Sequence, residues 1–161
     1  MLKKVTLKDL DSIDSIEKTC FPSQEAASKD SLKARLEVYP EGFYLYYVDE
    51  TPIGYIGLKN NQCELPDEMY ENASLHQLNG DYQLIFSVCI LPDYRHKGYA
   101  RKMVKEYVSL KENEVNGFVL TCKDHLILFY ESCGFKFVKV SASTHGNAKW
   151  NDMVRINERE R

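Results

Sequence analysis

The chain has 161 residues, of which 43% are hydrophobic and 28% are charged, and its formal net charge at pH 7 is -3. This length suits one domain over residues 1–161, with a frayed tail at 157–161, and the acidic balance argues against a general nucleic-acid binder. No apolar run approaches the roughly 18 residues of a membrane span, and residues 1–8 lack the core of a secretory signal, so we expect a cytoplasmic protein with no membrane partner.

Two helices are predicted in the N-terminal region. Thr6 and Asp9 have the spacing of a capping box, and apolar residues at helical intervals follow them as far as Cys20. A second amphipathic segment ends before Pro40. Its apolar positions are Leu32, Leu36 and Val38.

A hairpin and a central strand are predicted next. Residues 43–48 and 53–58 flank the tetrapeptide 49–52, whose Asp-Glu-Thr-Pro sequence is typical of an antiparallel turn. The polar segment 60–80 is longer than most structural loops, and we expect part of it to act as a substrate lid. Residues 82–90 then form a strand that is apolar on both faces, typical of a central strand covered by helices on both sides. We expect Leu84, Phe86, Val88 and Ile90 on one face, and Ile85 and Cys89 on the other.

Strands and helices alternate over the rest of the chain. A helix begins after Gly98, a strand spans 117–121, and a second helix spans 124–133 with Gly134 at its C-terminal cap. Strands at 135–140 and 150–156 complete the pattern. This order predicts an α/β (α+β mixed) fold with a mixed central sheet and helices on both faces.

The most informative segment runs from Val88 to Arg101, where a strand leads through a basic glycine turn into a helix. The first amide groups of a helix have no intrahelical partner, and the helix dipole adds partial positive charge, so this turn suits a pyrophosphate. Small residues at 98 and 100 let phosphate oxygens approach the main chain. Positive charge comes from Arg95, Lys97 and Arg101. The alternative is an ordinary strand-to-helix connection with solvated side chains.

The hexapeptide 95–100, Arg-His-Lys-Gly-Tyr-Ala, resembles the Q/R-x-x-G-x-G/A signature of the Gcn5-related N-acetyltransferases (GNAT). Residues 121–124 and 129–135 look like the family's second cofactor segment, in which a helix ends in a Y-x-x-x-G-F turn. Residues 21–26 and 74–76 are similar to segments of the arylalkylamine (serotonin) N-acetyltransferase branch. The resemblance covers about 21–156 and implies the GNAT fold, with acetyl-CoA as cosubstrate.

In that family the central strand splays from its neighbour at a bulge, and its freed backbone groups pair with the pantetheine arm of acetyl-CoA. Carried over, those groups belong to Val88 and Ile90. The resemblance therefore implies that the cofactor-binding residues are Val88, Cys89, Ile90, Arg95, His96, Lys97, Gly98, Tyr99, Ala100 and Arg101.

Acetyl transfer requires a proton for the departing thiolate and a neutral amine. Tyr130 matches the family's general-acid tyrosine, and a phenol with a pKa near 10 stays protonated at pH 7. The alternative for this side chain is a role in core packing. An alkylammonium has a pKa of about 10.4, so only about one molecule in a few thousand is neutral at pH 7 and a general base is expected.

The base is less clearly marked. The two strand histidines of vertebrate serotonin acetyltransferase would fall at Leu84 and Phe86, so that machinery is absent. The segment that ends at Glu25 looks like the glutamate segment of insect arylalkylamine enzymes, and desolvation at a pocket wall would raise the pKa of Glu25. An acid on the dipole of a helix N-terminus is the equal alternative. His76 and His145 are alternative bases.

The five cysteines include no C-x-x-C pair, and their odd number favours reduced, mostly buried thiols. The four histidines offer no zinc spacing, so we expect no metal. Cys122 or Cys133 could accept the acetyl group covalently, but their surroundings in sequence do not predict an activated thiolate, so direct transfer is preferred.

These features favour an N-acetyltransferase that moves the acetyl group of acetyl-CoA directly to a primary amine, a small arylalkylamine. Phe21, Tyr44, Tyr46 and Tyr55 are expected to help form the acceptor pocket. Polyamine or protein/peptide acetylation, and a non-catalytic acetyl-CoA sensor, are the alternatives. A homodimer is a further possibility.

Overall fold

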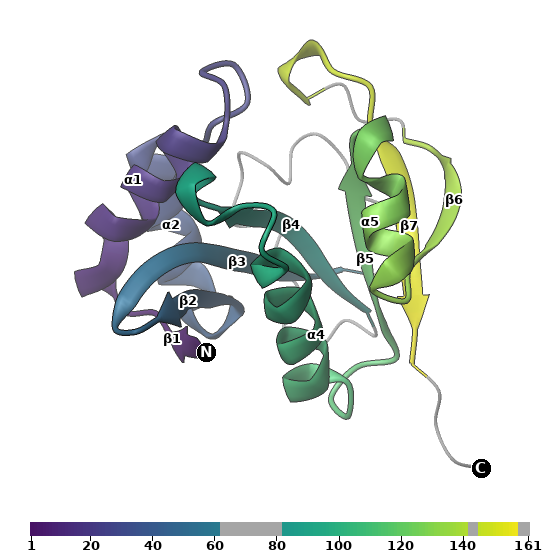
Figure 1. Cartoon of the computed structure of the whole chain (residues 1–161), viewed down its shortest axis with the longest axis horizontal. Helices are drawn as coiled ribbons and strands as arrows, with labels where there is room; N and C mark the ends of the chain where they lie inside the picture. Colours follow the sequence, from purple (N-terminus) through teal and green to yellow (C-terminus); the bar gives the residue numbers. More distant parts are fainter. Residues whose placement is uncertain (62–81, 142–144, 158–161) are drawn as a thin grey trace.

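The computed structural model describes residues 1–61, 82–141 and 145–157, which fold around a seven-stranded sheet in the order β1-β2-β3-β4-β5-β7-β6 (Figure 1). Its strands are β1 (Leu2–Lys4), β2 (Phe43–Val48), β3 (Thr51–Asn61), β4 (Tyr82–Ile90), β5 (Gly117–Cys122), β6 (Lys136–Val140) and β7 (Asn151–Ile156). Its α-helices are α1 (Leu10–Cys20), α2 (Lys29–Val38), α4 (Tyr99–Lys111) and α5 (Ile127–Ser132). Short 3-10 turns are η1 (Leu7–Asp9), η2 (Pro40–Gly42), η4 (Pro92–Tyr94), η5 (Asp124–Leu126) and η6 (His145–Asn147).

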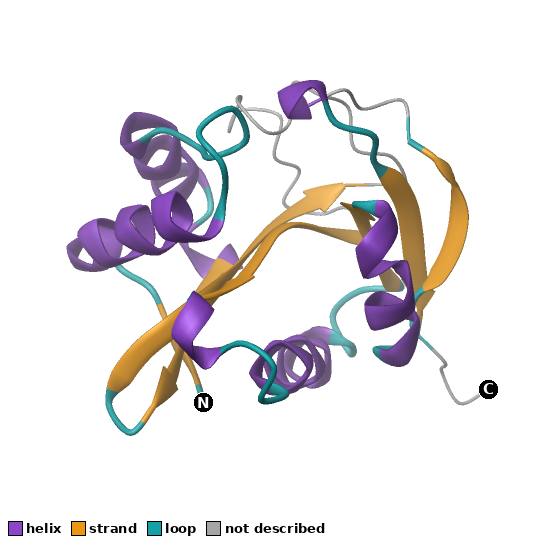
Figure 2. Ribbon diagram, turned by 45° about the horizontal axis from the view of Figure 1, so that its top comes forward, coloured by secondary structure: helices purple, strands orange, loops and turns teal. Residues whose placement is uncertain are grey.

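Helices cover both faces of the sheet (Figure 2). Residues of α1 and α2 pack on one face, where Phe43 and Leu45 of β2 point. Residues of α4 and α5 pack on the other face, where Tyr44 and Tyr46 point. This alternation follows from the two-residue period of a strand. The predicted mixed α/β fold is confirmed.

The sheet splits at its centre. Parallel pairing of β4 with β5 runs only from Tyr82 to Ile85, although β4 continues to Ile90. At the end of this pairing the β3–β4 register shifts, since Gly57 pairs with Ser87 and Leu58 with Ile85, which leaves Phe86 as an extra β4 residue. A bulge of this kind bends a strand and ends regular pairing. The predicted splayed strand pair is therefore present.

The bulge also corrects one prediction about β4. Ile85 was expected to lie on the opposite face from Ile90, but both belong to the core on the α4 side of the sheet, while Leu84 packs with Val119. One extra residue reverses the alternation of every side chain beyond it. The sequence pattern alone could not locate that reversal.

Most predicted element boundaries are within a few residues of the observed ones. The capping box at Thr6 and Asp9 is formed, although it caps η1, which leads directly into α1. The hairpin turn places Asp49 and Glu50 at positive φ, and β3 is longer than expected at both ends. The segment expected to be a helix over 124–133 is η5 followed by α5. Strand β1 was not predicted, because three residues carry no periodic signal.

The expected lid falls largely within 62–81, which lies outside the described residues, as does His76. None of the helices in the described ranges is long and apolar enough to cross a membrane.

Candidate active site

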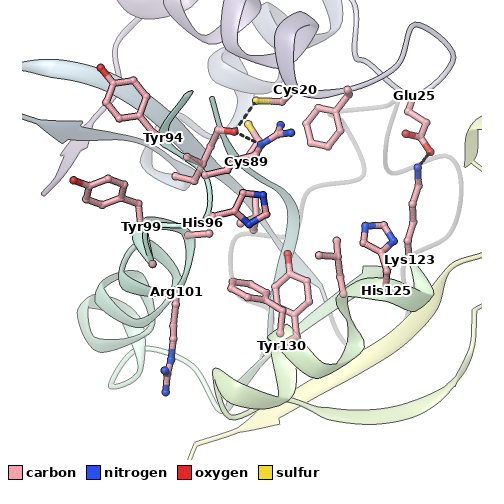
Figure 3. Close-up of a pocket in the computed structure, with 18 of the residues that line it drawn as sticks. Cys20, Glu25, Cys89, Tyr94, His96, Tyr99, Arg101, Lys123, His125 and Tyr130 are labelled. Atoms are coloured by element: carbon pink, nitrogen blue, oxygen red, sulfur yellow. Dashed lines mark hydrogen bonds and ion pairs between the residues drawn. The ribbon is translucent and has the colours of Figure 1, made fainter. Parts of the chain in front are cut away.

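A cavity of about 690 Å³ opens where β4 and β5 diverge (Figure 3). Its walls come from the α1–α2 connection, the end of β4, the start of α4, and η5 with α5. The lining residues are Cys20, Phe21, Pro22, Glu25, Val88, Cys89, Ile90, Tyr94, Arg95, His96, Gly98, Tyr99, Ala100, Arg101, Lys123, His125, Leu126, Phe129, Tyr130 and Trp150. All the predicted catalytic and cofactor-binding residues except Lys97 are among them.

The turn before α4 has an open, left-handed glycine. Gly98 is the N-cap of α4 with a φ of 83°, and no atom lies within 4 Å of the point where its Cβ would be. An L-residue is strained at this φ, so the backbone itself favours glycine here. No side chain caps the helix at this residue. The α4 terminus therefore presents amide groups and the positive end of its dipole next to open space.

The basic residues of the turn lie in different places. Arg95 folds back toward the strand, and its Nε donates to the carbonyl oxygen of Ile90 at 2.9 Å. Arg101 is a lining residue in the first turn of α4, and its guanidinium points away from the other lining side chains (Figure 3). Lys97 lies outside the lining, with its Nζ 6.0 Å from the centroid of the Tyr94 ring. Two arginines, rather than three cations, therefore line the cavity from this turn.

The part of β4 that lines the cavity, Val88 to Ile90, follows the last residue that pairs with β5. The amide of Leu91 donates to the carbonyl of Ile53 at 2.7 Å, so Leu91 faces β3. Main-chain groups alternate in direction along a strand, and those of Val88 and Ile90 therefore face the split. The Ile90 carbonyl already accepts from Arg95 and from the thiol of Cys20 at 3.4 Å. Val88 therefore offers the less occupied main-chain position.

Tyr130 is held by the end of α5. Its carbonyl accepts from the amide of Phe135 at 3.0 Å, and the Glu131 carbonyl accepts from the amide of Gly134 at 3.0 Å, which together form a Schellman motif. The Tyr130 ring packs edge-on against Phe129 and Phe135, at centroid distances of 5.0 and 5.9 Å. The residue is only 6% exposed, and its hydroxyl points into the cavity (Figure 3). The Y-x-x-x-G-F sequence thus fixes a phenol in the cavity wall.

Glu25 lies on the far side of the cavity from α4. Its Oε1 forms an ion pair with Lys123 Nζ at 2.5 Å, and its side chain is 6% exposed against 34% for Lys123. Gly146 packs so closely that a Cβ there would lie 2.6 Å from Glu25 Cγ. The Lys123 ammonium also lies 5.7 Å from the centroid of the Trp150 ring. Glu25 is therefore a buried carboxylate that is fixed by a cation and a glycine.

A buried network supports the loop that carries Glu25. Glu17 of α1 is 4% exposed and accepts from the amide of Ala27 at 2.8 Å. The hydroxyl of Tyr55 also donates to Glu17, and Ser87 Oγ donates to Tyr55 at 2.8 Å. Burial raises the pKa of Tyr55 well above its ordinary value, so this phenol stays protonated as a donor.

Three of the expected acceptor-pocket aromatics are core residues instead. Tyr44, Tyr46 and Tyr55 are each at most 5% exposed and do not line the cavity, because their strand positions point them into the two helix-covered faces. Phe21 does line it. Trp150, which was not among the predicted pocket aromatics, also lines it.

Lys123, His125 and Trp150, which were not predicted as site residues, lie beside the ends of strands. Lys123 and His125 come directly after β5, on the side of the sheet where β4 also ends. Loops at the ends of neighbouring parallel strands meet at one edge, which was an available signal for both residues. Trp150 directly precedes β7, an antiparallel neighbour of β5.

The candidate nucleophiles Cys122 and Cys133 do not line the cavity. Burial raises the pKa of Cys122 to about 11 and that of Cys133 above its ordinary value. Such thiols are poor nucleophiles at neutral pH. Of the alternative bases, His145 belongs to η6, but its side chain lies outside the described part of the chain. Within the described ranges, no group of three or more His, Cys, Asp or Glu side chains is placed to hold a metal.

A sequence model described as "Acetyltransferase (GNAT) family" matches residues 10–135. A comparison with curated protein sequences gave no significant match. Among solved structures, the ribosomal-protein-S18-alanine N-acetyltransferase from Escherichia coli is 15% identical with a TM-score of 0.74, over 100% of this chain and 96% of that chain.

Two other similar structures contain a CoA ligand. PaiA N-acetyltransferase from Thermoplasma acidophilum in complex with coenzyme A is 16% identical with a TM-score of 0.70, over 97% of this chain and 98% of that one. The GphF GNAT-like decarboxylase in complex with isobutyryl-CoA is 13% identical with a TM-score of 0.82, over 98% and 100% of the two chains. At these identities the likeness concerns the fold.

Proposed function

Because the chain belongs to the acetyltransferase (GNAT) family and is therefore an acetyl-CoA-dependent N-acetyltransferase, we propose that it acetylates a small primary amine by direct transfer. The observation that carries this proposal is one cavity that brings the Gly98 turn together with Tyr130 and Glu25. These residues come from three distant segments of the sequence. The proposal assigns this activity to one domain over the whole chain, which the spread of the lining from Cys20 to Trp150 supports.

The α4 side of the cavity suits the cofactor. The open space at Gly98 and the helix terminus fit a pyrophosphate, and Arg101 adds positive charge to the same end of α4. The main-chain groups of Val88 lie at the split and fit the amide-bearing arm of acetyl-CoA, as an added strand would. Arg95 contributes by fixing the strand end at Ile90.

Tyr130 is the proposed general acid. Its hydroxyl reaches the cavity while its ring is fixed by two aromatic contacts, so the donor is held in one orientation. As the amine nitrogen bonds to the acetyl carbon and the C–S bond breaks, the phenol donates its proton to the departing sulfur.

Glu25 is the proposed base. It is the acidic residue among the described residues of the cavity wall, and the contact with Lys123 holds one of its oxygens in place. It removes the ammonium proton before attack, directly or through water. His125 lines the same cavity and is the competing base.

The other side of the cavity favours a compact, partly aromatic amine, as in the arylalkylamine branch. Phe21 and Trp150 supply flat apolar surfaces in the lining. A polyamine carries several positive charges and needs several carboxylates, whereas the described lining offers Glu25, which is already paired with Lys123. This charge balance supports the small-amine substrate over the polyamine.

A substrate panel tests the proposal. Release of free CoA from acetyl-CoA is measured with phenethylamine and tryptamine, with spermidine, and with short peptides that have free N-termini. We expect the two arylalkylamines to give the highest kcat/KM. Preference for spermidine or for the peptides would replace the proposed substrate class. Acetyl-CoA binding without turnover on any amine would favour the sensor.

The tests of individual residues use the preferred amine. Glu25→Gln and His125→Gln are compared, and we expect the larger loss in kcat/KM from Glu25→Gln. The opposite order would transfer the base role to His125. The cytoplasmic location and the homodimer stay predictions from the sequence.

A further inference from the structure

Two thiols meet in the wall of the cavity. Cys20 is the last residue of α1 and Cys89 is the penultimate residue of β4, and both line the cavity. Cys20 Sγ contacts the Ile90 carbonyl oxygen, which also accepts from Arg95 Nε (Figure 3). Cys89 and Arg95 are both neighbours of the Cys20 thiol, and Figure 3 shows the sulfur atoms of Cys20 and Cys89 on the same part of the cavity wall. A pair of cysteines and a cation therefore converge at one point of the wall.

The two thiols differ in reactivity. Interaction with Cys89, and then with Arg95, lowers the pKa of Cys20 below its ordinary value despite partial burial. Burial raises the pKa of Cys89 well above its ordinary value. Cys20 is also the more exposed of the two thiols, whereas Cys89 is buried, so Cys20 is the nucleophile that a small disulfide reaches first. An attacking thiolate beside a second thiol is the arrangement that resolves mixed disulfides.

We propose that Cys20 and Cys89 form a redox-active dithiol site that reacts with low-molecular-weight disulfides. Cys20 is partly exposed and lines a cavity of about 690 Å³, so a small disulfide can reach it. Disulfides of reduced compartments are mostly regulatory or catalytic rather than structural. The proposal does not depend on which amine the enzyme acetylates.

The reaction proceeds in two exchanges. The Cys20 thiolate attacks one sulfur of the small disulfide, whose S–S bond breaks and releases a thiolate that takes up a proton. Cys89 then loses its proton and attacks Cys20 Sγ, which breaks the mixed disulfide and releases the second small thiol. Two protein thiols are oxidised to one disulfide, and the small disulfide is reduced to two thiols.

The bond would join α1 to β4 across the wall that we assign to the cofactor. Cys89 lies between Val88 and Ile90, whose main-chain groups face the split. Pulling this stretch toward α1 changes the strand edge that the cofactor is proposed to pair with. We therefore expect the oxidised protein to bind acetyl-CoA about tenfold more weakly or worse, and dithiothreitol to restore the affinity.

Peptide mapping by mass spectrometry tests the site in the full-length protein. Trypsin leaves Cys20 on peptide 19–29, but it leaves both Cys63 and Cys89 on peptide 60–95, so the experiment uses a Cys63→Ser background. After incubation with oxidised glutathione, and separately with CoA disulfide, we expect peptide 19–29 cross-linked to peptide 60–95. A faster reaction with CoA disulfide than with oxidised glutathione would identify CoA disulfide as the preferred oxidant of the site. Equal rates would mean that the site reacts with small disulfides in general.

Single variants separate the two steps. In Cys89→Ala we expect the reaction to stop with the small thiol still attached to Cys20, and in Cys20→Ser we expect Cys89 to stay reduced. Cys133→Ser is the matched control and should cross-link as the background does. Because each variant is examined by its adducts, loss of enzymatic activity does not affect the result.

Absence of the 20–89 cross-link with both disulfides would overturn the site, as would adducts on Cys122 or Cys133 forming before those on Cys20. Unchanged acetyl-CoA affinity in fully cross-linked protein would overturn the proposed control of binding. Neither result bears on amine acetylation by the reduced enzyme, which the substrate panel measures separately.

Discussion

The two sides of the cavity are built in different ways. The side that we assign to the cofactor comes from one continuous segment, 88–101, and relies on main-chain groups and a left-handed glycine. The side that we assign to the amine relies on side chains from separate places, namely Phe21, Glu25, Lys123 and Trp150. A site made of main-chain groups depends on the local backbone conformation, so a short sequence motif is enough to predict it. A side-chain site can be changed one residue at a time.

Tyr130 lies where the two sides meet, and its replacement has the largest expected effect. In Tyr130→Phe we expect kcat to fall at least roughly 100-fold, because loss of a general acid removes proton transfer to the leaving thiolate. The KM values of both substrates should change little, because the ring keeps its contacts with Phe129 and Phe135. Steady-state kinetics measure all three constants, with Tyr47→Phe as the control. An unchanged kcat would remove Tyr130 as the acid.

Gly98 tests the main-chain side alone. In Gly98→Val we expect the acetyl-CoA KM to rise about 30-fold, since a β-branched residue at a φ of 83° is strained by at least roughly 1–2 kcal/mol. The amine KM should not change. Gly98→Asn is the matched variant, because asparagine tolerates positive φ better, and we expect a smaller rise with it. If either variant raised the amine KM as much as the acetyl-CoA KM, the turn would not define a separate cofactor side of the cavity.

The same contrast explains how far the sequence could predict the molecule. The helix and strand order, the capping box at Thr6 and the turn at Gly98 all depend on residues close together in the chain, and they were predicted. The bulge at Phe86 was expected only from family resemblance, because no residue pattern marks where a strand gains an extra residue. The reversal of faces between Ile85 and Ile90 was consequently missed.

The side of the cavity that we assign to the amine was harder to predict. Glu25 and Phe21 were selected from a local motif and do line the cavity, but their neighbours Lys123 and Trp150 come from the loops around β5 and β7. Which distant side chains meet depends on the sheet order, with β7 inserted between β5 and β6. Tyr44 and Tyr46 were assigned to the pocket for their aromatic character, whereas strand alternation directs them into the core.

Substitutions of Glu25 and Lys123 test the side of the cavity that we assign to the amine. In Glu25→Gln we expect kcat/KM for the amine to fall about tenfold, less than the effect of Tyr130→Phe because water can accept the proton in part. Lys123→Met should also lower it, since the ion pair at 2.5 Å fixes the carboxylate. The acetyl-CoA KM should stay constant in both. Glu37→Gln, on the exposed face of α2, is the control.

A double-mutant cycle sharpens this test. If Lys123 acts by positioning Glu25, the double variant should be no worse than Glu25→Gln alone, because the two residues work as one unit. Additive losses would mean that Lys123 contacts the substrate independently. A change in acetyl-CoA KM in either variant would contradict the division of the cavity into two sides.

The buried network under the Glu25 loop has the smallest expected effect on catalysis. In Tyr55→Phe we expect the free energy of unfolding to fall by about 1–2 kcal/mol, because Ser87 loses a 2.8 Å acceptor and Glu17 loses a donor. Urea denaturation measures it, with Tyr47→Phe as control. Since burial raises the pKa of Tyr55, the protonated phenol stabilises the fold below about pH 10, and the wild-type advantage should shrink as the pH rises above that value. In Tyr55→Phe we expect kcat/KM for the amine to stay within about twofold of the wild-type value, as for most substitutions away from a site.

A loss of kcat/KM as large as that in Glu25→Gln would contradict this expectation. It would mean that Glu17 sets the position of Glu25 through the amide of Ala27, and that α1 belongs to the amine side of the cavity.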